Sequence, residues 1–100
     1  MSDETERIHI DLERLFPEAA RRVRVLEDLK RKWHSVIRRD IAAHSMPCVL
    51  GVNAITVLVD SEDTAKMIRK MKGNITRALS SRYGCMTDKD FTLTIKITAR

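Results

Sequence analysis

The chain has 100 residues and a mass of 11.5 kDa, which leaves room for one domain. Hydrophobic residues make up 43% of it and charged residues 33%, a balance that indicates a globular protein and excludes a disordered one. No apolar run approaches the roughly 20 residues of a membrane span, and the acidic start Met1–Glu6 is the opposite of a secretory signal. We therefore expect a cytoplasmic protein with no membrane partner: a loose acidic leader over residues 1–10 and a single domain over residues 11–100.

The net charge of +5 is unevenly placed along the chain. Residues 1–13 hold five acidic residues against one basic residue, whereas residues 14–82 hold 15 basic against 7 acidic ones. A basic body behind an acidic start suits a polyanion or an acidic protein surface as partner. The alternative is that the lysines and arginines only solvate the outer faces of two helices.

The first helix is predicted from apolar residues spaced three and four apart, which is the helical period. Pro17 is compatible with a first helical turn, so we expect the helix to begin there and to reach Ala43. It would be roughly 40 Å long, which is long for this domain, and we expect a bend between Arg21 and Leu26. The apolar positions are Leu12, Leu15, Phe16, Ala19, Val23, Leu26, Leu29, Trp33, Val36, Ile37 and Ile41.

A β-hairpin is predicted after this helix, which ends because Pro47 favours extended backbone in the residue before it. Cys48–Leu50 and Ile55–Val59 are rich in β-branched residues and are predicted to be its two strands. Gly51–Asn53 can turn the chain between them.

A second helix is predicted to follow Asp60 or Ser61 as its N-terminal cap and to reach Tyr83. Gly73–Asn74 is a weak point at which this helix can kink, and Gly84 can supply its left-handed stop.

The last element is the clearest strand, because Phe91–Thr98 alternates apolar and polar residues throughout. The predicted order is therefore α-β-β-α-β, and the fold class is α+β: a two-layer domain whose helices pack on one face of a three-stranded sheet.

Catalytic and metal-binding chemistry is not expected. Two cysteines are too few for a disulfide scaffold, and His44 and Cys48, the nearest pair of metal-ligand types, have no second pair beside them. The chain has neither a nucleophile held by an oriented base nor a glycine-rich phosphate loop. We expect no enzyme and no cofactor. The other candidate ligands considered are His9, His34 and Cys85.

Nucleic-acid binding remains possible through rows of basic side chains on the helices, because phosphate contacts supply affinity without sequence readout. Trp33 falls on the apolar stripe of the first helix, so we place it in the core and not on a base-stacking surface. The candidate residues for polyanion contact are Arg31, Lys32, Arg38, Arg39, Lys66, Arg69, Lys70 and Arg77.

The stretch Leu26–Gly84, about three-fifths of the chain, resembles the DciA family of bacterial proteins. The family pattern has a tryptophan, an aliphatic pair, the motif LAxHSxP, a hairpin whose second strand ends in VxS, and a helix. The chain matches it with Trp33, Val36–Ile37, Ile41–Pro47 (IAAHSMP) and Val59–Ser61 (VDS). It departs from it at Arg38 and Asn53, where glycines are usual, and at Thr64, where a tryptophan is common.

The resemblance implies a KH-like fold without the GxxG nucleotide clamp. It also implies a non-enzymatic adaptor that binds the replicative DNA helicase and assists its loading on single-stranded or forked DNA. Trp33, His44, Ser45, Pro47 and Ser61 are then mainly structural, although the His44 side chain could either cap the end of the first helix or touch a partner. The alternatives are a general RNA-binding KH-like module and a pure protein-interaction domain that forms a homo-oligomer through a sheet edge.

Overall fold

The computed structural model describes residues 14–85, 87–88 and 90–98, so the leader predicted at residues 1–10 lies outside the described residues. No helix in these ranges is both long enough and apolar enough to cross a membrane. The elements are α2 (Pro17–Arg31), α3 (Trp33–Val36), α4 (Arg39–Ala42), β1 (Ser45–Leu50), β2 (Ala54–Val59), α5 (Glu62–Lys70), α6 (Lys72–Tyr83) and β3 (Thr92–Ile97).

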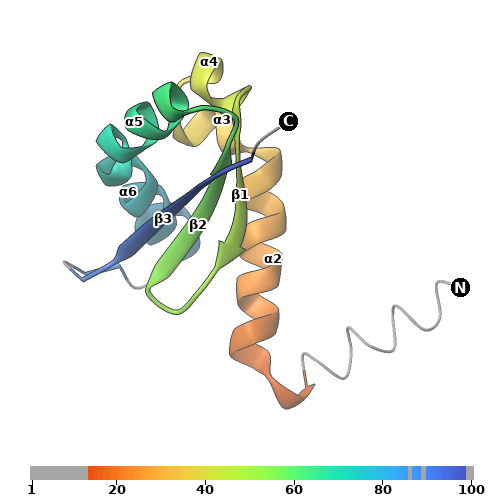
Figure 1. Ribbon diagram of the computed structural model, residues 1–100. Coiled ribbons are helices and arrows are strands. Elements are labelled where there is room, and N and C mark those ends of the chain that lie inside the picture. Colours follow the sequence, from red (N-terminus) through yellow and green to blue (C-terminus); the bar gives the residue numbers. More distant parts are fainter. Residues whose placement is uncertain (1–13, 86, 89, 99–100) are drawn as a thin grey trace, which may run out of the picture.

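The three strands form one sheet in the order β1-β2-β3. β1 and β2 are antiparallel neighbours, which confirms the predicted hairpin. β3 is parallel to β2, because α5 and α6 carry the chain back to the end of the sheet at which β2 begins. In Figure 1, α5 and α6 lie together on one side of the sheet and α2 runs beside β1. The predicted α+β class, with helices on one face of a three-stranded sheet, is confirmed.

The core lies between the sheet and the helices. A strand turns alternate side chains to opposite faces, and β2 accordingly buries Ile55, Val57 and Val59 on its helix side. Leu29 of α2 and Ile68 of α5 are completely buried against this cluster. Most residues of the apolar stripes thus lie in the core, although Val23 of α2 is 43% exposed, and the basic residues of the same helices remain at the surface.

The first predicted helix is divided into three, and the predicted bend at Arg21–Leu26 is wrong, because α2 runs through it unbroken. The chain breaks instead at Lys32 (φ −109°, ψ 17°) and at Ile37, which is extended (φ −124°, ψ 171°). The reason is that the length of α2 matches the length of the strands on which it packs. The 15 residues of α2 span about 22 Å, close to the roughly 20 Å of a six-residue strand, so the chain must turn there to stay on the core.

The second predicted helix breaks at Met71 (φ −98°, ψ 12°), two residues before the weak point expected at Gly73–Asn74. Met71 is buried, and burying such a side chain contributes roughly 1.5–3 kcal/mol. A glycine in a helix interior costs only about 1 kcal/mol. Packing of Met71 therefore decides where the helix breaks, and Gly73 becomes the second residue of α6.

The strand ends differ slightly from the expectation. β1 begins at Ser45, three residues before the predicted strand, and includes Pro47. A proline is tolerated there because β1 is an edge strand, and the register with β2 shifts between Pro47 and Val49. β3 lies within the predicted range, and Gly84 ends α6 with the predicted left-handed conformation (φ 64°).

Candidate nucleic-acid interface

Trp33 and Ser45, twelve positions apart, are joined by a hydrogen bond that fixes α3 against β1. The indole Nε1 of the buried Trp33 donates to Ser45 Oγ at 2.8 Å. The same hydroxyl donates to the carbonyl of Ile41 at 2.9 Å, so this carbonyl at the end of α4 accepts a second bond besides the one from the His44 amide at 3.0 Å. One serine thereby connects α3, α4 and the hairpin.

His44 and Asp60 form a second link between the ends of the hairpin strands. The imidazole Nδ1 lies 2.5 Å from Asp60 Oδ2. Asp60 Oδ1 accepts a bond from the Thr64 hydroxyl at 3.1 Å, and the bond from His44, followed by that from Thr64, lowers the pKa of Asp60. Because this carboxylate is ionised and can only accept, Nδ1 is the donor. The His44 side chain is therefore not a helix cap: Ser45 bonds the α4 carbonyl instead.

Ser61 is the N-cap of α5, which decides between the two predicted candidates. Its side chain accepts a hydrogen bond from the Thr64 amide at 3.2 Å. Glu62 and Asp63 follow in the first turn, where the helix dipole favours negative charge.

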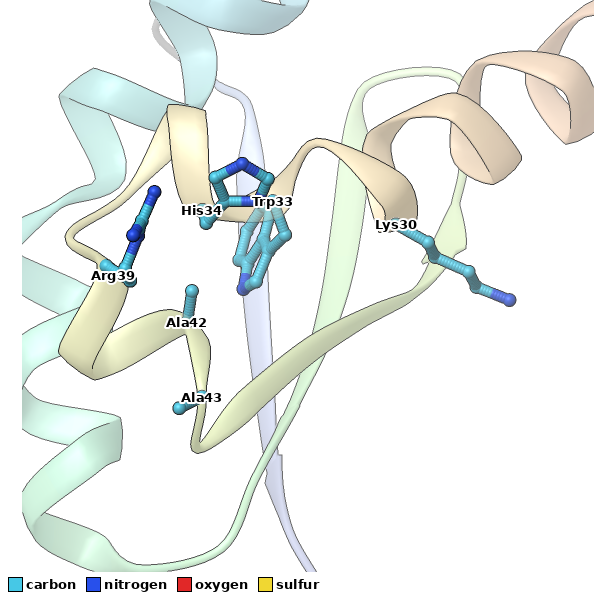
Figure 2. Close-up of a pocket in the computed structure, with 6 residues that line it drawn as sticks. All are labelled: Lys30, Trp33, His34, Arg39, Ala42 and Ala43. Atoms are coloured by element: carbon cyan, nitrogen blue, oxygen red, sulfur yellow. The ribbon is translucent and has the colours of Figure 1, made fainter.

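A first hollow of about 410 Å³ opens over α3 and α4. In the view of Figure 2, Arg39 stands on the left, the His34 ring and the Trp33 indole lie next to each other in the middle, and the Lys30 side chain points outward on the right. Ala42 and Ala43 add small apolar side chains to the lining. The hollow thus combines an apolar floor with nitrogen-bearing side chains around it.

A second hollow of about 240 Å³ lies between α3 and α6. Arg77 and Arg82 of α6 line it together with Ser35. Arg82 donates to Ser35 Oγ at 2.6 Å and to the Ser35 carbonyl at 3.2 Å. These acceptors are neutral, so they fix the guanidinium in place without cancelling its charge.

The two hollows both open at α3: His34 lines the first and the next residue, Ser35, lines the second. We call the lysine, arginine and histidine side chains that line them the α3 surface. Among the described residues that line the two hollows, none is acidic. Such a surface can bind an extended anion at several points along its length. The members of the α3 surface are Lys30, His34, Arg39, Arg77 and Arg82.

Two of the eight residues predicted to contact a polyanion, Arg39 and Arg77, lie on the α3 surface. Neither side chain has a hydrogen-bond or ion-pair partner within the described part of the chain, so both are available to a ligand.

The other six predicted residues lie elsewhere. Arg31 and Lys32 pair with Asp28 at 3.1 and 3.4 Å, and Arg38 pairs with Asp40 at 2.9 Å. The remaining three project from the exposed face of α5 and line neither hollow. They are Lys66, Arg69 and Lys70.

Sequence reasoning missed three members of the α3 surface. Lys30 and His34 are four residues apart, which is helical spacing, and that signal could have found them. Arg82 falls on the same stripe of the second helix as the apolar residues Ala78 and Leu79, so it was not among the basic residues predicted at the surface. In the structure it is exposed and reaches Ser35, 47 positions away, and nothing local in the sequence indicates this contact.

The candidate metal ligands other than His9, including the two cysteine thiols, also lie in the described part of the chain. Within residues 14–85, 87–88 and 90–98, no group of three or more histidine, cysteine or acidic side chains could hold a metal ion. Cys48 and Cys85 are both free thiols, and burial raises the pKa of Cys85, which makes its thiolate harder to form.

What the α3 surface can bind follows from its own side chains. Guanidinium and ammonium groups bind phosphate oxygens, and the buried Trp33 leaves little aromatic face for stacking. No protein-family model, curated protein or solved structure matches this chain.

Proposed function

We propose that this protein is a non-enzymatic DNA-replication adaptor of the DciA kind, which binds DNA through the α3 surface and helps to place the replicative helicase on single-stranded or forked DNA. The observation that carries the proposal is the basic lining of two hollows beside α3 that hold no acidic side chain among their described lining residues. An adaptor needs no hydrolysis of its own, because the helicase supplies the ATPase.

The side chains favour contact with the DNA backbone over base readout. Arginine and lysine bind phosphates of any sequence, and base stacking requires exposed aromatic rings. Trp33 is only 3% exposed, so it cannot serve as such a platform. A helicase adaptor must act at many sequences, and sequence-tolerant binding fits that requirement.

The motif residues that resemble the DciA pattern support the same proposal indirectly. Trp33 and Ser45 join α3 to β1, and His44 and Asp60 join the two ends of the hairpin. These bonds set the positions of α3 and α4, and with them the places of His34 and Arg39. The motif residues are thus positioning residues for the α3 surface.

The DNA half of the proposal is tested by the salt dependence of binding, measured by fluorescence anisotropy of labelled single-stranded DNA. Each phosphate contact contributes about 0.7 to the slope of log K against log salt. We expect Arg39→Ala and Arg77→Ala each to reduce the slope by about that amount.

Two matched controls accompany these variants. Lys96→Ala removes an exposed charge from the opposite face of the sheet and leaves the slope unchanged. Arg31→Ala removes a charge already paired with Asp28 and has a smaller effect than Arg39→Ala. A slope of zero for the unaltered protein, or equal effects of all four substitutions, rejects the α3 surface as a DNA site.

The helicase half is tested by pull-down of the replicative helicase of the same organism with the purified protein. Retention of the helicase supports the adaptor role, and its absence refutes that role. Competition between forked DNA and a structured RNA then addresses the alternative: preference for the RNA would favour a general RNA-binding module.

A further inference from the structure

The two edges of the sheet differ in how they are protected. The β1 edge has α2 beside it (Figure 1) and carries two features that oppose further strand pairing, Pro47 and the register shift before Val49. β3 forms the other edge and pairs with β2 in an unbroken register over Thr92–Ile97.

Half of the backbone groups of β3 point away from the sheet. The Thr92 amide donates to the Asn53 carbonyl, just before β2, at 3.0 Å. The Thr98 amide donates to the carbonyl of Val59, the last residue of β2, at 2.9 Å. Because backbone groups alternate sides along a strand, the N–H and C=O groups of Leu93, Ile95 and Ile97 face the open edge. Within the described part of the chain they meet no further strand.

The β3 strand carries only one of the usual devices that prevent pairing, a charged side chain. It contains no proline, and its single charge, Lys96, projects on the face away from the helices. Ile97 lies on the helix-side face yet is 44% exposed. An edge with one charge, no proline and an exposed apolar side chain at its border is a template for another strand.

A second copy of the same strand fits this edge. In antiparallel pairing about a two-fold axis at Ile95, Leu93 of each copy faces Ile97 of the other, so the apolar row of the core continues across the junction. On the other face, Lys96 opposes Thr94. An axis at Lys96 would place two like charges directly opposite each other, which is destabilising.

The charges of α5 favour the same arrangement. α5 packs against β3 and β2, so it is the helix nearest the open edge. Its first turn is acidic, with Glu62 and Asp63, and its last turn is basic, with Arg69 and Lys70. The two-fold axis makes the two α5 helices antiparallel, which brings the acidic end of each towards the basic end of the other.

We propose that two copies of this protein associate through antiparallel β3 strands into one six-stranded sheet, with the helices of both copies on the same side. The partner is a second copy of this chain, because the strand is complementary to itself in pattern and α5 is complementary to itself in charge.

The first test is sedimentation velocity over a range of protein concentrations. We expect a reversible shift from 11.5 kDa to twice that mass. Ile97→Lys places a charge at the junction and should weaken the association at least about tenfold. Val49→Lys is the matched control, since Val49 is a strand valine, 55% exposed, on β1, and it leaves the association unchanged.

The second test uses charge exchange on α5. The double variants Glu62→Lys/Asp63→Lys and Arg69→Glu/Lys70→Glu should each associate more weakly alone and recover association when mixed, because opposite charges then meet. A purely structural effect of either variant is not rescued by mixing. Circular dichroism verifies that each variant is folded.

Three outcomes overturn the proposal: a monomer at every concentration, equal effects of Ile97→Lys and Val49→Lys, or no recovery in the mixture. Amide exchange identifies other occupants of the edge. If the amides of Leu93, Ile95 and Ile97 are protected at monomer mass, a segment of the same chain covers the edge, and the second copy is excluded.

Discussion

The hydroxyl of Ser45 bonds to two neighbouring structural elements, α3 and α4, so its replacement by alanine should lower the stability of the fold. It accepts from Trp33 Nε1 and donates to the Ile41 carbonyl. Ser45→Ala leaves a buried indole N–H without a partner, and we expect a loss of about 1–2 kcal/mol in the free energy of unfolding. Urea denaturation measures it, with Ser80→Ala as an exposed control. Equal losses for the two variants would contradict this role.

Tyr83 should make the free energy of unfolding depend on pH in the alkaline range. Burial, together with the hydrogen bond that its hydroxyl donates to Asp28 at 2.7 Å, raises the pKa of Tyr83 from 10.0 to about 12. The folded state holds this proton more tightly than the unfolded state. The stability that Tyr83 contributes is therefore complete below pH 10 and is lost as the pH rises through about 12. Tyr83→Phe should remove this part of the pH dependence of the free energy of unfolding.

Asp28 allows a complementary measurement, because the chain has one tyrosine whose absorbance reports its ionisation. Asp28→Asn should lower the pKa of Tyr83 without returning it to 10.0, since burial, the larger cause, remains. The bond from Tyr83 is in turn the main cause that lowers the pKa of Asp28. That contribution to stability is present above pH 3.8 and is lost as the pH falls through the lowered pKa. An unchanged tyrosine titration in Asp28→Asn would contradict the coupling.

Replacement by alanine should have opposite effects at Gly73, within α6, and at Gly84, the C-cap that follows it. At Gly73, nothing lies within 4 Å of an added Cβ, so Gly73→Ala should stabilise by about 0.5 kcal/mol through helix propensity. Gly84 has a φ of +64°, where a Cβ costs about 1–2 kcal/mol, so Gly84→Ala should destabilise by about that amount. Gly84→Asn should cost less, because asparagine tolerates this conformation. Thermal denaturation measures all three, and equal signs at the two sites would refute the argument.

The elements that local sequence determines were predicted well, and the breaks between them were not. The alternation of Phe91–Thr98 and the stop at Gly84 depend on neighbouring residues, and the structure has both. The breaks at Lys32 and Met71 depend on the length of the sheet and on packing from other elements. Periodicity cannot show either of these, because an apolar stripe looks the same whether its helix is straight or divided.

The candidate site was predictable only in composition. Arg39 and Arg77 were identified from charge, but the contact between Arg82 and Ser35 spans 47 positions and exists only once α3 lies beside α6. Sequence also could not separate free cations from paired ones, such as Arg38 beside Asp40. Which charges gather on one surface is a property of the tertiary fold.

At the level of the whole molecule, DNA binding by the α3 surface and pairing of two copies through β3 together predict that the apparent affinity for DNA depends on the length of the DNA strand. A two-fold axis through β3 puts both helical layers, and so both α3 surfaces, on the same side of the joined sheet. A strand long enough to reach both surfaces binds the second one intramolecularly, which raises the apparent affinity at least about tenfold. A strand too short to reach both gains nothing.

Ile97→Lys separates this avidity from the intrinsic contact. It should weaken binding of long single strands to the level of the monomer and leave binding of short strands unchanged, because Ile97 is not part of the α3 surface. Val49→Lys should leave both unchanged. Anisotropy titrations with short and long strands measure the difference. If Ile97→Lys weakened binding of both lengths equally, residue 97 would be acting at the DNA contact itself and not through pairing of two copies.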